Sequence, residues 1–374
     1  MKNVLGIINL HEHEELLSTL TGHRPLAALP FGGRFRLIDF ILSNMVNSGI
    51  HTVGVLTKHR FRSLIDHLRS GKEWDLARKQ DGLFILPPPD HIHYSNSIYK
   101  GDLEFFYNNL DFIRKSSQEY ILIAGSQIVC NINFNDAFRF HLERGADITL
   151  LYKTERPQPG RTFTMATLLN LDEDGRVADM EIKPGQIAGG NIGMEMLIVA
   201  KTRLVEIIQD CVARGQFDFT KEGIIRNLRR YRIYAYPYSG YMARIDSVQS
   251  FYRANLDLLK PEIWESLFSQ DEPIYTKVRD EAPAQYCEDA AVRNSLVANG
   301  CIIEGRVENS LLFRGVRIAR GAVVRDSIIM QDSIIQSNAT LDNVICDKEV
   351  CISSGKRLSG DANFVMVIDK RRVV

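Results

Sequence analysis

The chain has 374 residues, of which 45% are hydrophobic and 25% are charged, as in an ordinary globular protein with room for two domains. Its 46 basic and 46 acidic residues give a formal net charge of zero, which argues against a large nonspecific nucleic-acid surface but allows a local basic patch. The apolar stretch 4–10 is too short for a membrane span and no cleavage-site pattern follows it, so we expect a cytoplasmic protein without a membrane or nucleic-acid partner.

From the start of the chain to about residue 260, short apolar runs alternate with helical patterns. The runs predicted to be strands are 3–10, 51–57, 119–125, 147–152 and 232–237. The stretches predicted to be helices are 60–71, 102–116, 134–145, 202–215 and 248–260. This alternation predicts an α/β domain with a mostly parallel, Rossmann-like sheet and helices on both faces. Such sheets bind ligands beyond the carboxyl ends of their strands.

The chain changes character after residues 261–285, a proline-bearing and acidic stretch that we interpret as a connector. Beyond it, apolar residues recur every six positions, a period that fits neither a helix nor a single strand. It predicts a parallel β-helix with short stacked sides, with a β-sandwich of short strands as the alternative. The rows are Val323, Ile329, Ile335 and Leu341; Val316, Ala322, Ile328 and Ile334; and Leu312, Ile318 and Val324.

The cysteines are scattered and include no Cys-x-x-Cys pair. This usage predicts buried free thiols in a reducing cytoplasm. The six residues are Cys130, Cys211, Cys287, Cys301, Cys346 and Cys351.

Three stretches together resemble a known family. They are "ALPFGGRFRLIDFILSNMVNSGI" (28–50), "FYRANLDLL" (251–259) and "NSLVANGCIIEGRVENSLLFRGVRI" (294–318). The chain is similar over nearly its whole length to bacterial glucose-1-phosphate adenylyltransferase, also called ADP-glucose pyrophosphorylase. The resemblance implies a nucleotidyltransferase-type α/β domain at 1–260, a left-handed β-helix of hexapeptide repeats at 286–374, a tetramer and a role in glycogen synthesis.

The reaction of this family makes demands that can be compared with the sequence. Glucose 1-phosphate attacks the α-phosphorus of ATP, and pyrophosphate leaves. A glycine-rich loop with an arginine holds the phosphates through its N–H groups. Carboxylates hold Mg²⁺ against the triphosphate, and a lysine binds the sugar phosphate.

The phosphate loop of the family falls on residues 11–17, and every glycine of its pattern is missing. The arginine position holds Leu16. Glu12, Glu14 and Glu15 bring negative charge toward the place of a triphosphate, and a carboxylate about 5 Å from a phosphate charge costs roughly 3 kcal/mol at an effective dielectric of about 20. Side chains in this loop also obstruct a close approach of the backbone. We therefore expect that the loop no longer binds phosphates.

Two interpretations of the loop itself remain. A metal site could form from His11, His13 and a glutamate, although a spacing of one residue between two histidines is a weak signal. The simpler interpretation is a solvated acidic loop.

The metal-binding carboxylates implied by the resemblance are also replaced. The Gly-Asp-His motif after the strand at 119–125 reads Gly-Ser-Gln, so the first aspartate has become Ser126. The second aspartate position, in the stretch "MARIDS", holds Arg244, a cation that would exclude Mg²⁺. Asp246, two residues further on, could substitute only if the backbone repositioned it. We predict no catalytic residue and no bound metal in this chain.

Some substrate-binding positions remain. Lys183 matches the lysine that the family uses for the sugar phosphate, although a solvated lysine in a proline turn explains it equally well. Gly101 keeps the tight turn of the adenine-side motif. Asn191 stands where a serine near the sugar is expected.

Losing the loop, its arginine and both aspartates while the scaffold motifs persist resembles the noncatalytic, regulatory subunit of this family. That resemblance implies a homologous catalytic subunit as partner in a heterotetramer, with Mg²⁺ and ATP bound by the partner and no cofactor bound by this chain. The alternatives are an active or weakly active adenylyltransferase and a noncatalytic sensor of sugar phosphates or nucleotides. A β-helix acyltransferase needs a histidine on the coil, and none follows His141.

The resemblance also implies a site for a sugar-phosphate effector, which in the family lies between the N-terminal loop and the β-helix. Its candidate residues here are His23, Arg24, Arg34 and Arg36. Arginines suit bidentate phosphate contacts, but surface arginines beside a turn are common without a ligand. Other basic positions of the family are lost, at Leu26, at Pro30 and around residues 342–343.

Overall fold

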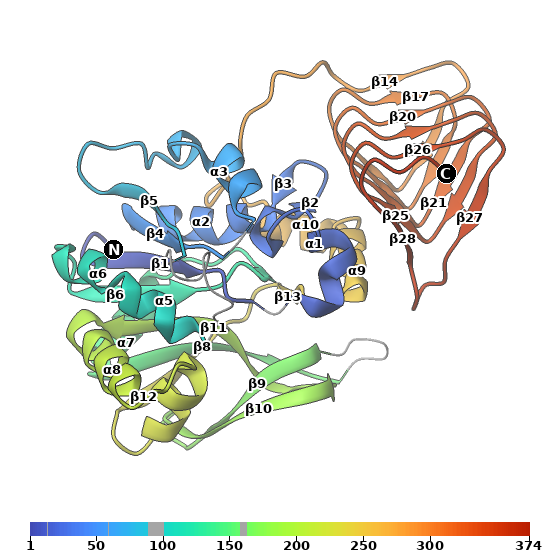
Figure 1. The fold of residues 1–374 in the computed structure, drawn as a ribbon. Coiled ribbons are helices and arrows are strands. Elements are labelled where there is room, and N and C mark those ends of the chain that lie inside the picture. The colour runs from blue at the N-terminus through green and yellow to red at the C-terminus, as the bar shows by residue number, and fades with distance from the viewer. Residues whose placement is uncertain (13, 59, 89–100, 158–162) are drawn as a thin grey trace. The chain divides into compact units, whose positions relative to one another are not determined.

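The computed structural model of the chain describes residues 1–374 except 13, 59, 89–100 and 158–162 (Figure 1). Residue contacts divide the chain into two compact units that do not follow each other along the sequence. The first unit comprises Met1–Glu12, Phe40–Met242 and Asp271–Tyr275. The second comprises His13–Asp39, Ala243–Gln270 and Thr276–Val374.

Within the described residues, a nine-stranded sheet forms the centre of the first unit (Figure 1). Parallel neighbours run in the order β6-β1-β4-β5, and β12 pairs parallel with β8. β11 joins β6 and β8 in antiparallel fashion, and β9 and β10 extend that side. The strands are β1 (Val4–Asn9), β4 (Thr52–Leu56), β5 (Gly82–Leu86), β6 (Tyr120–Ala124), β8 (Ile148–Glu155), β9 (Phe163–Leu171), β10 (Val177–Ile187), β11 (Gly190–Ala200) and β12 (Ile233–Pro237).

The five predicted strands are confirmed as β1, β4, β6, β8 and β12. The antiparallel strands β9, β10 and β11 were not predicted. Their burial patterns do not follow a regular two-residue alternation, and β10 and β11 contain glycines and a proline, so neither sequence signal for a strand is strong here.

Helices cover both faces of the parallel strands. Leu5 and Ile7 of β1 belong to one apolar core with residues of α5, α6 and α8. Gly6 faces the opposite side, where an added Cβ would lie 2.8 Å from the Met45 sulfur of α2. The helices of this region are α2 (Leu37–Asn47), α3 (Arg62–Leu68), η3 (Lys72–Trp74), α5 (Asp102–Asn108), α6 (Leu110–Lys115), α7 (Asn135–Glu143), α8 (Lys201–Ala213), η4 (Phe219–Ile224) and η5 (Ile225–Asn227), and the short strand β7 (Ile128–Val129) follows β6.

The predicted helix 102–116 is divided at Asn109, which ends α5 and begins α6. The Phe105 carbonyl accepts from both the Asn109 side chain at 2.9 Å and the Asn109 N–H at 3.1 Å, and the backbone of Asn109, with φ −105° and ψ 17°, lies outside the helical range. The other predicted helices are confirmed as α3, α7, α8 and α9.

The second unit combines short N-terminal elements with two helices and a β-helix. Ser247 and Ser250 form a capping box that begins α9, and Pro261 begins α10 inside the stretch predicted as a connector. The elements before the β-helix are η1 (Glu15–Leu17), α1 (Ser18–Thr21), η2 (Leu26–Ala28), β2 (Pro30–Phe31), β3 (Phe35–Arg36), β13 (Ala243–Arg244), α9 (Val248–Asp257) and α10 (Pro261–Leu267).

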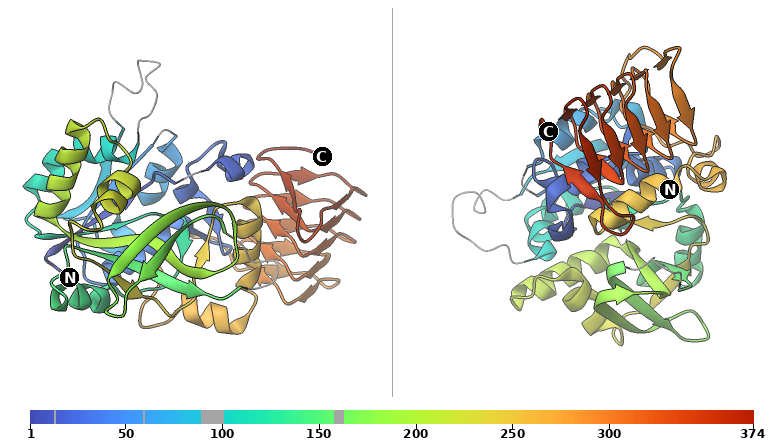
Figure 2. Two further views of the ribbon diagram at one scale, coloured as in Figure 1. Left: turned by 90° about the horizontal axis from the view of Figure 1, so that it is seen from below. Right: turned by 90° about the vertical axis from the view of Figure 1, so that its right-hand side faces the viewer.

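Three five-stranded parallel sheets form the sides of the β-helix, whose coils stack in register (Figure 2). This confirms the predicted left-handed β-helix and excludes the β-sandwich. The strands are β14 (Gln285–Tyr286), β15 (Ala291–Arg293), β16 (Leu296–Val297), β17 (Ile302–Ile303), β18 (Arg306–Glu308), β19 (Leu311–Leu312), β20 (Arg317–Ile318), β21 (Val323–Arg325), β22 (Ile328–Ile329), β23 (Ile334–Ile335), β24 (Thr340–Asp342), β25 (Val344–Cys346), β26 (Cys351–Ile352), β27 (Arg357–Ser359) and β28 (Met366–Ile368).

The predicted six-residue rows do not match the interior of the β-helix throughout. Ile334 is 41% exposed and Val323 is only half-buried. The register joins Arg317 to Ile334 and Ile334 to Cys351, so these coils advance by 17 residues and not by the 18 of three hexads. The interior row therefore shifts by one residue in each of these 17-residue coils. Its buried members are Leu312, Ile318, Val324, Ile329, Ile335, Leu341, Cys346 and Ile352.

One outer face of the β-helix is covered within its own unit. Leu311, Ile328 and Ile345 alternate with interior residues along their strands, yet all three are fully buried. Tyr252 of α9 donates to the carbonyl of Asp326 at 2.5 Å, beside the strand that carries Ile328. The sheet of β16, β19, β22, β25 and β28 therefore has apolar residues on both faces.

The cysteines are free thiols, as predicted. Four are buried and two, Cys287 and Cys351, are half-buried. Among the helices in the described parts of the chain, none has the length and apolar character needed to cross a membrane.

Candidate functional site

The loop after β1 carries the main feature of the candidate nucleotide site. β1 and β6 are parallel, so their carboxyl ends meet at one edge of the sheet. There, Oε1 of Glu12 accepts hydrogen bonds from the backbone N–H of Ser126 at 2.5 Å and from its hydroxyl at 2.8 Å. Glu12 is 6% exposed and Ser126 is fully buried. A carboxylate thus lies against the backbone that follows β6.

The surroundings hold Glu12 in place from a second side. Lys58 donates from Nζ to the carbonyl oxygen of Glu12 at 2.8 Å. Burial raises the pKa of the Glu12 carboxyl, while the N–H of Ser126 and the charge of Lys58 act in the opposite direction. The expected solvated acidic loop is therefore wrong for Glu12. Glu15 is exposed, as that interpretation requires.

His11 lies in an apolar setting. Its ring is 4.1 Å from the ring of Phe105 in an edge arrangement, and burial lowers its pKa to about 3. His13 lies outside the described residues. In the described parts of the chain, no group of three or more His, Cys, Asp or Glu residues could hold a metal ion.

Gly101 and Asp102 anchor the start of α5. An added Cβ at Gly101 would lie 2.2 Å from the carbonyl oxygen of Phe217, so chain packing alone requires this glycine. Asp102 accepts from the N–H of Phe219 at 2.9 Å, and Asn9 donates to its other oxygen at 3.4 Å. Burial raises the pKa of Asp102 to about 6. Only the turn at Gly101 was singled out from the sequence, and this buried acid was not.

Lys183 and Asn191 both interact with groups of their own sheet. Lys183 lies on β10 opposite Ala166, so the predicted proline turn is wrong, and its ammonium is 3.0 Å from the Glu181 carboxylate. The Asn191 side chain accepts from the Thr154 hydroxyl at 2.8 Å and donates to a backbone carbonyl at 3.3 Å. Lys183 keeps an exposed side chain that a ligand could reach.

A further polar pair near the end of β6 was missed from the sequence. The Gln127 side chain donates to the carboxylate of Glu195, which lies on β11. Glu195 has φ 55°, in the left-handed region that non-glycine residues rarely adopt. Only the tertiary pairing of β6 with β11 brings these two residues together, so no local signal could have found them.

The other replaced positions lie in the second unit. Leu16 is 59% exposed in η1, and Arg244 is 6% exposed on β13. Asp246 accepts from the Ser247 hydroxyl at 3.3 Å, while its own N–H donates to Ser250. Asp246 is thus part of the cap of α9.

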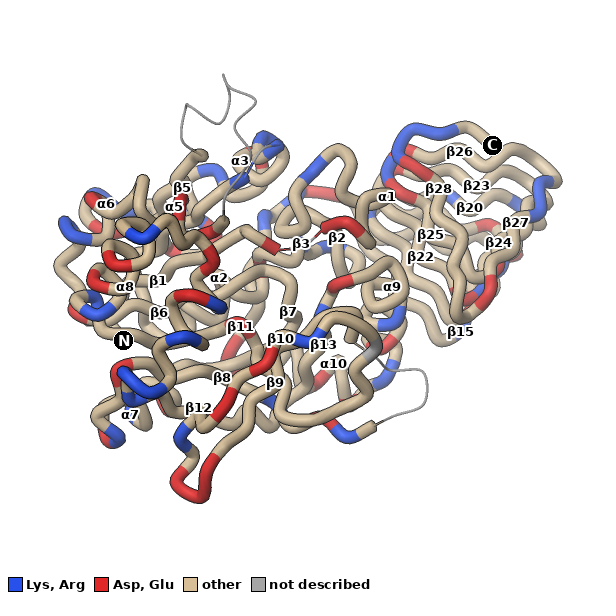
Figure 3. Tube along the Cα trace, turned by 60° about the horizontal axis from the view of Figure 1, so that its bottom comes forward, with Lys and Arg blue, Asp and Glu red and all other residues tan. Residues whose placement is uncertain are grey.

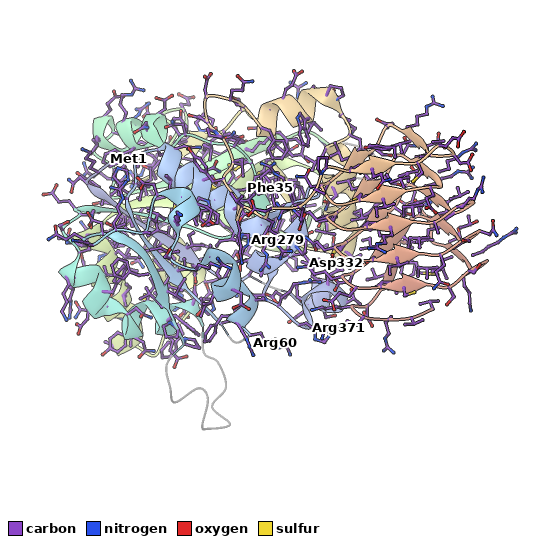
Figure 4. The ribbon with its side chains drawn as sticks, turned by 90° about the horizontal axis from the view of Figure 1, so that it is seen from above. Met1, Phe35, Arg60, Arg279, Asp332 and Arg371 are labelled. Carbon is purple, nitrogen blue, oxygen red and sulfur yellow. The ribbon has the colours of Figure 1, made fainter. Side chains whose placement is uncertain are left out.

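The effector candidates differ in how they are engaged. Arg24 is 5% exposed, forms an ion pair with Asp347 of the β-helix and donates from Nε to the Leu20 carbonyl at 3.0 Å. His23 is exposed. Arg34 is exposed and lies 4.9 Å from the centre of the Phe35 ring, which Figure 4 labels.

Lys348 adds a basic group that the sequence did not single out. Burial is the main cause that lowers its pKa to about 7; the positive charges of Arg36 and Arg24 contribute to this lowering, and Asp347 opposes it. Asp347 also accepts from the backbone N–H of Lys348 at 2.7 Å. Because 323 residues separate Arg24 from Asp347 in sequence, this cluster exists only in the folded unit.

More positive charge follows at the end of the β-helix, where Figure 3 shows a blue segment leading to the C-terminus. The Lys370 ammonium is 3.6 Å and the Arg371 Nε is 2.6 Å from the Glu349 carboxylate. Figure 4 labels Arg371 on the β-helix. The candidate effector region of the second unit is therefore basic, with Asp347 and Glu349 as counter-charges.

Comparisons with known proteins agree with this architecture. A nucleotidyl transferase family model matches residues 15–239, and a GlmU-like C-terminal hexapeptide model matches residues 282–364. The chain is 39% identical over 367 residues to the glycogen biosynthesis protein GlgD of Bacillus subtilis, covering 98% of this chain and 96% of that protein. It is 40% identical over 322 residues to GlgD of Geobacillus stearothermophilus, covering 86% and 82%. It is 33% identical over 377 residues to glucose-1-phosphate adenylyltransferase of Clostridium perfringens, covering 100% and 96%.

Proposed function

The chain belongs to the glucose-1-phosphate adenylyltransferase family, and we propose that it is a catalytically silent, regulatory subunit of this enzyme in glycogen biosynthesis. The enzyme converts ATP and glucose 1-phosphate into ADP-glucose and pyrophosphate. In the proposal, a homologous catalytic subunit performs this reaction, and the present chain modulates it.

One observation carries the proposal. Pyrophosphate is a polyanion, and its departure requires donors that point at developing negative charge. Here the Glu12 carboxylate occupies the N–H and hydroxyl of Ser126, at the sheet edge where α/β proteins bind ligands. The loop presents an acid where the reaction needs donors.

The metal chemistry points in the same direction. Mg²⁺ prefers oxygen ligands, and carboxylates hold it against substrate phosphates. Ser126 offers a neutral hydroxyl that already donates to Glu12, and Arg244 adds a cation at the second family position. We therefore assign Mg²⁺ and ATP to the catalytic partner and none to this chain.

The proposal includes assembly with that partner in a heterotetramer. A silent subunit changes its partner's activity only when it binds the partner's states with different free energies. The β-helix offers exposed outer rows, such as the one that contains Ile334, for contacts of this kind. The basic groups around Lys348 offer a place for a sugar-phosphate effector.

The test compares three preparations: this chain alone, the catalytic chain alone and the two co-expressed. ADP-glucose formation is measured with ATP, glucose 1-phosphate and Mg²⁺. The chain alone is expected to be silent, and the mixture to differ from the catalytic chain alone. Turnover by this chain alone within about tenfold of an ordinary enzyme, on the order of 10 per second, contradicts the proposal.

A second candidate is a sensor that binds sugar phosphates or nucleotides without chemistry. The exposed side chain of Lys183 favours it, because a ligand can reach its ammonium beside the Glu181 carboxylate. Calorimetry with ATP, ADP-glucose and glucose 1-phosphate separates the two functions. Glucose 1-phosphate binding that Lys183→Met abolishes supports the sensor.

A further inference from the structure

The contact between Glu12 and Ser126 goes beyond the loss of catalytic groups. We propose that the Glu12 carboxylate is a built-in ligand of an anion site formed by the amide and hydroxyl of Ser126, and that this site accepts a phosphate oxygen once Glu12 is removed. The proposal rests on the silent-subunit function and deepens it. Loss of the family's catalytic groups alone would leave a phosphate site that binds weakly. Here the Glu12 carboxylate occupies the site.

The geometry is that of a bound anion. Both donors converge on the same oxygen, Oε1 of Glu12, at 2.5 and 2.8 Å. A Cβ added to Gly125 would lie 3.3 Å from that oxygen, so the backbone of residues 125 and 126 closes around it. A backbone N–H together with a hydroxyl is also what proteins direct at phosphate oxygens.

Hydrogen bonds to the backbone hold the Glu12 side chain in this position. Lys58 binds the carbonyl oxygen of Glu12 and so fixes the backbone from which the side chain reaches Ser126. β1 fixes the chain just before it, since the N–H of Leu10 donates to the carbonyl of Leu56 at 3.1 Å. With its backbone tied and only 6% of its surface exposed, Glu12 is pre-organised as an intramolecular ligand with a high effective concentration.

A mobile or merely repulsive acid would look different. An acid that acted only through repulsion would stay hydrated, as the exposed Glu15 does. Glu12 instead gives up its hydration for two protein donors. Two explanations therefore predict different results for variants of Glu12. In the first, called occupancy, the side chain fills the anion site; in the second, called charge, its negative charge only repels a phosphate.

The test uses the full-length chain and inorganic tripolyphosphate as the probe in isothermal titration calorimetry. Glu12→Ala empties the site, Glu12→Gln keeps the volume and the hydrogen-bond acceptor but removes the charge, and Glu15→Gln removes a charge from the exposed part of the loop. Occupancy predicts that Glu12→Ala binds the probe at least about tenfold more tightly than the wild type. It predicts that Glu12→Gln and Glu15→Gln stay within roughly threefold of the wild type.

Two results overturn the proposal. One is a Glu12→Ala variant that folds and binds no better than the wild type. The other is a Glu12→Gln variant that binds as tightly as Glu12→Ala, because charge would then explain the whole effect.

Acetate supplies a second readout that does not depend on phosphate. Free acetate should raise the melting temperature of Glu12→Ala in a saturable way and compete with tripolyphosphate, without changing the wild type. If Glu12→Ala fails to fold in plain buffer, refolding in acetate is expected to recover it. Equal effects of acetate on both proteins, or no recovery, contradict the inference.

The outcome is distinguishable from that of the proposed function. ADP-glucose formation by the same wild-type preparation tests silence, whatever the variants bind. A silent wild type with an unresponsive Glu12→Ala rejects only the built-in ligand. An active wild type rejects the silent subunit.

Discussion

Glu12 in the first unit and Asp347 in the second are both buried carboxylates, but they are stabilised in different ways. Glu12 is 6% exposed and accepts from the neutral amide and hydroxyl of Ser126, with the charge of Lys58 acting in addition. Asp347 is 1% exposed and pairs with the Arg24 guanidinium. In the first unit an acid fills a pair of donors at the sheet edge, where we propose that the nucleotide site is lost. In the second, an acid balances cations that remain.

The difference supports the proposal that the two candidate sites depart from the family pattern in opposite senses. In the proposed nucleotide loop, an acid fills the donors of Ser126. The proposed effector region carries Arg24 and Arg36, whose positive charges act on Lys348. A subunit that receives a regulatory anion without turning over a nucleotide would need this combination.

The largest effect that tests this comparison is expected at Arg24. Arg24→Met leaves Asp347 buried without its cation, and breaking a buried pair on one side costs about 3–5 kcal/mol. Urea unfolding measures the loss of stability. The matched control is Arg293→Met, since Arg293 is largely exposed and its ion pair is worth at most about 1 kcal/mol.

A double variant sharpens this result. Arg24→Met with Asp347→Asn removes both charges, and it should recover part of the lost stability because no buried charge is left unpaired. A cost below about 1 kcal/mol for Arg24→Met alone would show that Asp347 is readily hydrated, and the contrast with Glu12 would then be lost.

The second prediction concerns pH and Lys348. A lysine whose folded pKa is about 7 binds fewer protons than in the unfolded chain between pH 7 and about 10.4, so stability rises with pH across this window. After allowance for solvent at the half-buried amine, the rise should be about 2–4 kcal/mol. Urea midpoints between pH 6 and 10 measure it, and Lys348→Met should remove it.

Lys370→Met is the control for that profile, because Lys370 lies on the same end of the β-helix and pairs with Glu349. It should leave the rise intact. If both variants flatten the profile equally, general surface charge and not the buried amine is its cause.

The sequence predicted β1, β4, β6, β8 and β12 and most of the helices beside them, because their apolar periods are strong and local. It missed the parallel strand β5, the helix α2 and the antiparallel strands β9 to β11, whose burial patterns do not follow a regular two-residue period. It also failed at Ile334, where the coil length of 17 displaces the hexad phase. The composition of the loop was visible in sequence, but its fold was not. Ser126 lies 114 residues from Glu12, and only the pairing of β1 with β6 brings them together.

The third prediction concerns how Asp102, in the first unit, makes stability depend on pH. The pKa of Asp102 is raised to about 6, so the folded chain binds more protons than the unfolded chain between pH 3.8 and about 6, and stability falls as pH rises through this window. The expected fall is about 1–3 kcal/mol. Asp102→Asn should flatten it while its carbonyl still accepts from the N–H of Phe219.

Glu12 acts in the same direction, since its pKa is also raised. Urea midpoints of Asp102→Asn and of Glu12→Gln between pH 4 and 7 separate the two contributions. If both variants keep the wild-type dependence of stability on pH, the buried acids of this unit are more hydrated than the structure shows.

The last prediction concerns regulation itself. Mixing this chain with its catalytic partner should change the maximal rate or the sugar-phosphate activation roughly 5- to 100-fold, a coupling of about 1–3 kcal/mol. Because Arg24 forms an ion pair with Asp347, the effector test changes Arg36 and Lys348 instead. Arg36→Ala with Lys348→Met should reduce the modulation at saturating effector, while size-exclusion chromatography still shows the complex.

Arg293→Met controls for loss of a surface charge, and loss of assembly would assign the pair a structural role. Full modulation in an intact double-variant complex would mean that the effector acts through the catalytic chain alone, and that the positive charge of the second unit serves folding and not regulation.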